Sequence, residues 1–255
     1  MTTLVNVATS LDGTAHIANT ISTGKIMAKR IIFTPTELHE PKLFNEILVD
    51  FTWVAGLAIS QGQKSVSNLH TSALGIPGIN SILEISTRSL DPLGLSLSAF
   101  NLELLQGGRK YPVESVYQSS KVFSDGGPYF DLLSASSLDA KRDPRLKSSG
   151  ELIGFSFESQ TWPVSSAPNF YDYLYIRALL ENSSRLNLIR FDAFSDLAFN
   201  QITIKPKLGK SFNCQARSAA IYSSLMNRMP EKEILAWISK EFMKSRDLND
   251  QLKMF

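Results

Sequence analysis

The clearest alternation of apolar and polar residues in this chain covers residues 47–53. Large apolar side chains stand at every second position there, with Leu48, Asp50 and Thr52 between them. A period of two is typical of a β-strand that turns one face toward the core. Shorter apolar runs predict further strands at 30–34, 82–85 and 153–157.

Helical spacing of apolar residues appears later in the chain. It predicts a helix at 170–180, which Asn169 would cap, and a final helix that begins at Pro230. The remaining segments predict a helix at 65–74, a hairpin turn at 106–109, loops at 191–200 and 204–210, and a helix beginning at Ser211 or Asn213.

Domain organisation follows from the absence of any repeat or linker. Residues 30–255 are expected to form one domain, and 255 residues suffice to bury a sizeable core. Residues 1–29 are rich in Thr, Ser, Ala and Asn without a sustained period, which predicts an N-terminal extension or arm.

Composition is that of an ordinary globular protein, with 43% hydrophobic and 20% charged residues. A net charge of +2 gives no general attraction to nucleic acid, so any DNA contact must come from a local patch. The single cysteine, Cys214, excludes an internal disulfide, and the scattered histidines offer no zinc-ligand spacing. No cofactor or metal is expected. No apolar run reaches membrane length, and a cytoplasmic location is expected.

The segment 111–123 carries the most informative spacing. Pro112 would open a helix in which Glu114, Gln118 and Lys121 lie on one stripe. Glu114 and Lys121 are too far apart for an ordinary ion pair along a helix. The acid and the amine either form a solvated stripe that complements the helix dipole or converge on a ligand between them.

Two further segments carry polar groups suited to phosphate. Ser86, Thr87 and Arg88 follow a predicted buried strand, where the arginine is either a two-pronged phosphate contact or an exposed loop residue. Residues 140–147 hold four cations and one acid. That run is either a solvated face or a contact to the DNA backbone.

The segment 111–123 resembles the signature helix of the NADAR family, the YbiA-like N-glycosidases. Other parts of the chain match the family in the same order, and the chain looks most like the NADAR antitoxins paired with DarT-type DNA ADP-ribosyltransferase toxins. Ala99 departs from the family, which has Asn there. The matching residues are Glu114, Tyr117, Gln118, Lys121 and Phe123 in the helix, residues 86–89 and 94–100 before it, and residues 196–200 and 213–217 after it.

The resemblance implies an α+β fold, mainly helical, with N-terminal strands and a hairpin. It also implies hydrolysis of the N-glycosidic bond between ADP-ribose and guanine in DNA, with ADP-ribose as product. Glu114 would act as acid, base or charge stabiliser. Lys121 would either hydrogen-bond the ribose and tune Glu114 or form a Schiff base with the opened sugar. Asp196 would hold ribose hydroxyls or orient water, or would serve only as a loop cap.

The resemblance assigns the remaining candidates to substrate binding. Asn213 could instead be a helix cap, and Arg217 a partner for a nearby acid. Tyr129, Trp162 and Phe199 either stack on a base or belong to the core, where most aromatic residues lie. The candidates are Ser86, Thr87 and Arg88 with Asn213 and Arg217 for pyrophosphate and ribose, Tyr129, Trp162 and Phe199 for stacking on a base, and Ser98, Phe100 and Gln118.

Two other functions fit the same family. One is cleavage of the N-glycosidic bond in riboflavin-pathway intermediates or ADP-ribose-like small molecules. The other is a non-catalytic module that binds ADP-ribose or sequesters the cognate DarT-type toxin, which is a further candidate partner in either case. Retention of Glu114 and Lys121 favours catalysis, and the basic run favours a nucleic-acid substrate.

Overall fold

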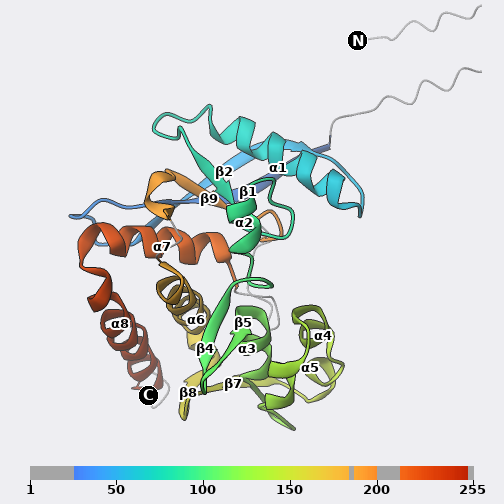
Figure 1. Ribbon diagram of the computed structural model, residues 1–255, viewed down its shortest axis with the longest axis vertical. Helices are drawn as coiled ribbons and strands as arrows, with labels where there is room; N and C mark the ends of the chain where they lie inside the picture. The colour runs from blue at the N-terminus through green and yellow to red at the C-terminus, as the bar shows by residue number, and fades with distance from the viewer. Residues whose placement is uncertain (1–25, 184–186, 200–212, 252–255) are drawn as a thin grey trace, which may run out of the picture.

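The computed structural model describes residues 26–183, 187–199 and 213–251, with side chains to residue 242 in the last helix (Figure 1). Helices and strands are mixed along the chain, which confirms the expected α+β class. The elements are β1 (Ile26–Pro35), β2 (Phe44–Trp53), α1 (Ile59–Ala73), β3 (Ile82–Glu84), α2 (Pro92–Ser96), β4 (Glu103–Gln106), β5 (Arg109–Pro112), α3 (Val113–Ser119), β6 (Lys121–Phe123), η1 (Phe130–Ser134), α4 (Ser137–Arg142), α5 (Arg145–Ser148), β7 (Leu152–Phe157), β8 (Gln160–Pro163), η2 (Val164–Ser166), α6 (Ala167–Glu181), η4 (Leu188–Arg190), β9 (Ala193–Ser195), α7 (Gln215–Arg228) and α8 (Glu231–Gln251).

A four-stranded sheet in the order β2-β1-β9-β3 lies between helices α1 and α7 (Figure 1). β1 pairs with β2 and β9 in antiparallel fashion, whereas β3 and β9 are parallel. The alternation in β2 sends Val49 and Phe51 toward Val66 and Leu69 of α1. The strand predicted at 47–53 is therefore confirmed, and its partner β1 is longer than the predicted 30–34.

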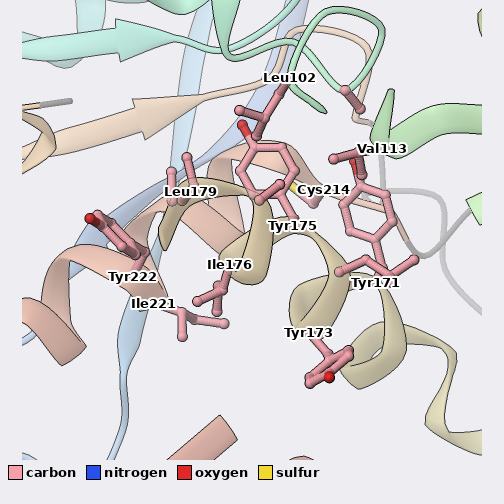
Figure 2. Close-up of a cluster of buried hydrophobic side chains, with 14 of the residues drawn as sticks. Leu102, Val113, Tyr171, Tyr173, Tyr175, Ile176, Leu179, Cys214, Ile221 and Tyr222 are labelled. Atoms are coloured by element: carbon pink, nitrogen blue, oxygen red, sulfur yellow. The ribbon is translucent and has the colours of Figure 1, made fainter. Parts of the chain in front are cut away.

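Helix α6 forms the centre of the main core. It is apolar nearly all round, as expected of a helix covered on every side. Figure 2 shows its Tyr171, Tyr175 and Leu179 among buried side chains that include Cys214 of the segment before α7. The buried Tyr175 hydroxyl donates a hydrogen bond to the Leu97 carbonyl oxygen at 2.6 Å, which satisfies the polar end of the ring.

The hairpin β4–β5 delivers the chain into α3. Gly107 and Gly108 form its turn with φ of +57° and +81°, the conformation that the predicted Gly-Gly turn requires. Past the hairpin, the Val113 amide donates to the Leu102 carbonyl and the Glu114 amide to the Ala99 carbonyl, each at 2.9 Å. These bonds fix the start of α3 against residues 99–102.

The predicted helix over 111–123 is wrong at its C-terminal end. α3 ends at Ser119, and Lys121 begins β6, which pairs with β7 through Phe155 and Gly154. Pairing with another strand outweighs the local preference for helix because it buries Phe123 and satisfies the backbone. Lys121 is therefore not on the helical stripe with Glu114.

Other boundaries also differ from expectation. Residues 26–29, expected in the N-terminal arm, belong to β1, and residues 1–25 lie outside the described residues. α6 begins at Ala167 with Ser166 as its N-cap, so Asn169 lies inside the helix and does not cap it. The predicted loop at 191–200 contains the short strand β9, and the predicted loop at 204–210 lies outside the described residues.

Candidate functional site

Glu114 is a buried carboxylate in the first turn of α3. Only 3% of its surface is exposed. Gln118, one turn later, donates a hydrogen bond from Nε2 to Glu114 Oε1 at 2.8 Å. The expected contact between positions i and i+4 is thus present. The Oε1 atom of Gln118 is buried without a hydrogen-bond partner, so this amide retains an acceptor.

Lys121 reaches the same region from β6. Its Nζ lies 5.1 Å from the centre of the Tyr117 ring, a cation–π distance. Burial lowers the pKa of Lys121 to about 8, while Glu114 opposes the shift and Lys141 adds to it. A substantial fraction of Lys121 is therefore neutral near physiological pH, which a nucleophilic amine requires.

A second lysine contacts the Glu114 carboxylate. Lys141 Nζ of α4 lies 3.4 Å from Glu114 Oε1 and 5.0 Å from the centre of the Phe100 ring. Helices α3 and α4 pack side by side (Figure 1). The sequence placed Lys141 only in the basic run, because no spacing rule links residues 114 and 141.

Asp196 is joined to the same region by Gln215, a residue to which sequence reasoning assigned no role. Gln215 Nε2 donates to Asp196 Oδ2 at 3.3 Å, and Gln215 Oε1 accepts from the Ala99 amide at 2.5 Å. The Ala99 carbonyl oxygen also accepts a hydrogen bond from the Glu114 amide. The backbone of Ala99 therefore links Asp196 and Gln215 to the start of α3.

The surroundings of Asp196 change its affinity for protons. Burial, with the Glu84 carboxylate nearby, raises the pKa of Asp196 to about 7. The Gln215 side chain and the backbone amides of Gln215 and Ala198 bond the carboxylate and oppose the shift. Gln215 is the first residue of α7, so a negative charge there also complements the helix dipole.

Two tyrosines lie between these groups. The Tyr117 side chain is hydrogen-bonded to Asn213, and burial together with Glu114 raises the pKa of its hydroxyl. Tyr171 packs edge-on against Tyr117 with ring centres 5.3 Å apart. Burial raises the pKa of Tyr171, and the charges of Glu114 and Asp196 raise it further, which places both carboxylates within electrostatic range of one ring.

The segment after β3 is held by Glu84. The buried Glu84 carboxylate accepts from Ser86 Oγ at 2.7 Å, from Ser195 Oγ at 2.5 Å and from the Leu197 amide at 2.9 Å. Ser86 is thus engaged in positioning the strand that carries Asp196.

The neighbouring Thr87 is exposed, and Arg88 is half-buried. A Cβ on Gly62 of α1 would lie 2.4 Å from Arg88 Cδ, so the arginine stem lies against this helix. Ser98 is buried, and its carbonyl accepts the Leu102 amide at 2.8 Å.

Two of the predicted binding residues lie in the hydrophobic core. Trp162 is 1% exposed and packs on Phe170 and Tyr173, and Phe199 is 6% exposed and packs on Phe33. The stacking role expected for both is wrong in this structure, because stacking on a base needs an accessible ring face.

Tyr129 is half-buried and is also occupied. Arg145 lies over its ring at 4.5 Å, and its hydroxyl is hydrogen-bonded to Ser149. Its expected stacking face is thus taken by a guanidinium. The same arginine is paired with Asp131 and Asp143, so the basic run has fewer free cations than the sequence suggested.

Arg217 does not lie with Glu114. It forms a buried ion pair with Asp172 at 3.1 Å and donates to the Pro168 carbonyl at 3.2 Å. Arg217 and Asp172 line a separate cavity of about 740 Å³ at the starts of β2 and α6. The alternative in which Arg217 serves a nearby acid is confirmed, and a pyrophosphate contact is not supported.

Within the described residues, no group of three His, Cys, Asp or Glu side chains could hold a metal ion. Over the same residues, no helix combines the length and the apolar character that crossing a membrane requires.

The fold and the site together define an α+β domain in which a buried carboxylate, Glu114, is paired with Lys141 and lies within electrostatic range of Lys121. A second buried carboxylate, Asp196, is hydrogen-bonded through Gln215 to the Ala99 backbone. Residues 28–251 match the family described as DarT1-associated NADAR antitoxin. This match covers most of the chain, which therefore belongs to the DarT1-associated NADAR antitoxin family. Among curated proteins, no match to the chain is found.

Proposed function

We propose that this protein is an antitoxin enzyme that hydrolyses the N-glycosidic bond between ADP-ribose and guanine in DNA, and so reverses the modification made by a cognate DarT-type toxin. Membership of the DarT1-associated family supports the antitoxin part. The observation that carries the enzymatic part is the buried Glu114 beside the amine of Lys121, whose pKa is lowered to about 8. Buried ionisable groups with a perturbed pKa cluster at functional sites.

The reaction requires charge stabilisation at the anomeric carbon and a group that attacks it. Breaking the glycosidic bond leaves an electron-poor, oxocarbenium-like sugar, which a buried carboxylate such as Glu114 stabilises. Guanine leaves with the electron pair of the bond and takes up a proton. Glu114 in its acid form, or water, would supply that proton.

Lys121 has two roles compatible with this scheme. As a nucleophile, its neutral amine bonds to the anomeric carbon as the bond to guanine breaks. One amine proton then passes to the Glu114 carboxylate or to water. The other passes to the ring oxygen, which becomes a hydroxyl as the sugar ring opens and the imine forms. Water then adds to the imine and releases ADP-ribose and the free amine. Alternatively, the Lys121 ammonium group hydrogen-bonds the ribose and tunes Glu114, while water attacks the anomeric carbon directly.

Asp196 would bind ribose hydroxyls or orient the attacking water. Its raised pKa of about 7 lets it accept a proton near neutral pH. Gln215 couples its position to that of Glu114 through Ala99. The expected substrate contacts of Phe100, Gln118 and Asn213 remain part of this proposal, because all three lie beside Glu114, Lys141 or Tyr117.

The direct test is incubation with single-stranded DNA that carries one ADP-ribosylated guanine. Mass spectrometry should show free ADP-ribose and unmodified DNA in equal amounts. Glu114→Gln should stop release, whereas Glu103→Gln, at an exposed carboxylate of β4, should not. No release by the native protein would refute the proposal.

Two further measurements separate the alternatives. Borohydride added during turnover should trap ADP-ribose on Lys121 if the imine forms, and Lys121→Arg should abolish the adduct. If Glu114→Gln still protects toxin-expressing cells fully, sequestration of the toxin replaces catalysis as the function. Release from small ADP-ribosides but not from DNA would favour the small-molecule substrate.

A further inference from the structure

Two lysines face one buried carboxylate, and they differ in their environment. Lys121 is half-buried on β6, whereas 53% of the Lys141 side chain is exposed on α4. Only Lys141 lies within ion-pair distance of Glu114, at 3.4 Å. The Phe100 ring beneath its ammonium group, at 5.0 Å, favours this placement.

We infer that Lys141 is a positioning residue of the site: its ammonium group, held over the Phe100 ring, engages the Glu114 carboxylate in an ion pair and so sets the electrostatic surroundings of Lys121. The inference rests on the proposed function for its consequence in catalysis. It assigns to Lys141 a role distinct from the contact to the DNA backbone expected of the basic run.

The two amines influence each other's protonation. A cation near Lys121 makes a second positive charge costly, and this effect adds to burial, which is the larger cause of the lowered pKa of Lys121. Lys141 acts in this sense on Lys121, while Glu114 acts in the opposite sense. By forming the ion pair, Lys141 also occupies Glu114 Oε1, so the carboxylate is less available to stabilise an ammonium at position 121.

Other groups near Lys121 do not supply this effect. Tyr117 of α3 offers a ring face, which favours the ammonium form. β7, the strand paired with β6, carries no titratable side chain. From α6, Tyr171 faces Glu114 and Tyr117, and burial keeps its hydroxyl neutral.

The remaining acids of the neighbouring elements have their own partners. Asp131 of η1 is paired with Arg145, and Asp139 of α4 accepts from Ser136 Oγ at 2.6 Å. Lys141 is therefore the cation, among the described residues, that acts on both groups of the site.

The test measures the proton affinity of Lys121 without any substrate. The full-length protein is treated with a trace of acetic anhydride at a series of pH values, and acetylation of Lys121 is quantified by peptide mass spectrometry. In the native protein the labelling midpoint should lie near pH 8. In Lys141→Met, which keeps an apolar stem on Phe100, the midpoint should rise by about 0.5–1 pH unit.

Two control variants make the assignment specific. Lys141→Arg keeps the charge and should leave the midpoint unchanged. Lys240→Met removes an exposed lysine of α8 and should also leave it unchanged. A midpoint in Lys141→Met equal to the native one would overturn the inference, and so would an upward shift in Lys141→Arg as large as that in Lys141→Met.

A kinetic readout ties the effect to catalysis. The acid limb of the pH profile of kcat/KM on ADP-ribosylated DNA should move to higher pH in Lys141→Met, with activity recovered at alkaline pH. A variant that is equally impaired at every pH would contradict the inference. If the native protein releases no ADP-ribose, the proposed function fails, whereas the labelling experiment still decides the role of Lys141.

Discussion

Lys141 Nζ lies 3.4 Å from Glu114 Oε1, although the lysine side chain is half exposed and the carboxylate is buried. The ion pair therefore spans the boundary between solvent and the interior of the site. Lys141 is therefore the solvent-accessible member of this ion pair.

Replacing Glu114 with Gln keeps the shape of the side chain and removes its charge. Loss of a group that stabilises charge or transfers a proton should lower kcat by about 100-fold to 10,000-fold. Release of ADP-ribose from modified DNA measures the effect, with Glu103→Gln as control. A Glu114→Gln enzyme within a few-fold of native activity would remove this residue from the mechanism.

Replacing Lys121 with Met should stabilise the protein at neutral pH. The pKa of Lys121 is lowered from 10.5 to about 8 in the folded state, so between these pH values the unfolded chain holds more protons. The free energy of unfolding of the native protein therefore rises from pH 8 to 10.5. At pH 7 the buried ammonium costs stability, and Lys121→Met should gain about 1–2 kcal/mol.

Urea denaturation at pH 7 to 10.5 checks this prediction. The two proteins should converge in stability as the pH rises, because the native lysine loses its charge. Lys240→Met, at an exposed position, serves as the control. A constant difference across the whole range would show that burial of charge is not the cause.

Replacing Asp196 with Asn should flatten the pH dependence of stability at acidic pH. The pKa of Asp196 is raised from 3.8 to about 7, so the folded state holds more protons between these values. The free energy of unfolding therefore falls as the pH rises through this window, by about 1–3 kcal/mol.

Urea denaturation between pH 4 and 8 should show this decline in the native protein and not in Asp196→Asn. Asp50→Asn, at an exposed carboxylate paired with Lys29, should retain the native decline. An unchanged decline in Asp196→Asn would assign it to other groups.

Replacing Gln215 with Glu tests the connection between the two carboxylates. The new side chain still accepts the Ala99 amide but places a negative charge where Gln215 now donates to Asp196. Displacement of Asp196 should lower kcat/KM by about 10-fold to 100-fold. Gln160→Glu, at an exposed position of β8, is the control. Equal activity in both variants would contradict the positioning role.

Replacing Arg217 with Met distinguishes a structural ion pair from a substrate contact. Asp172 would be left buried without its cation, and stability should fall by about 3–5 kcal/mol. The KM of the folded enzyme for modified DNA should stay unchanged, and Arg217→Lys should lose less stability. A large rise in KM with native stability would restore the substrate contact.

The spacing of residues along the sequence predicted the contacts that form within one helix or one turn. Glu114 and Gln118 are one helical turn apart, and their side chains form the contact that this spacing favours. The Gly107–Gly108 turn was equally predictable, because few residues tolerate its backbone angles. Lys121 was placed on the wrong element, since pairing of β6 with β7 cannot be inferred from residues 111–123 alone.

Contacts between distant segments were beyond such inference. Lys141 contacts Glu114, and Gln215 joins Asp196 to Ala99, only because α3, α4 and α7 meet in the fold. The aromatic residues illustrate the opposite error. Trp162 was a candidate platform for a base on the strength of its type, but packing against Phe170 and Tyr173 uses its ring in the core.

The hydrogen-bonded chain from Asp196 to Glu114 closes only through Gln215, the first residue of α7. A ribosome must therefore have translated and released most of the polypeptide before this connection can form. A prematurely terminated product that ends ahead of α7 would contain Glu114 and Asp196 and yet lack the residue that connects Asp196 to the start of α3. During synthesis of this antitoxin, the connection would therefore form only after translation has passed residue 215.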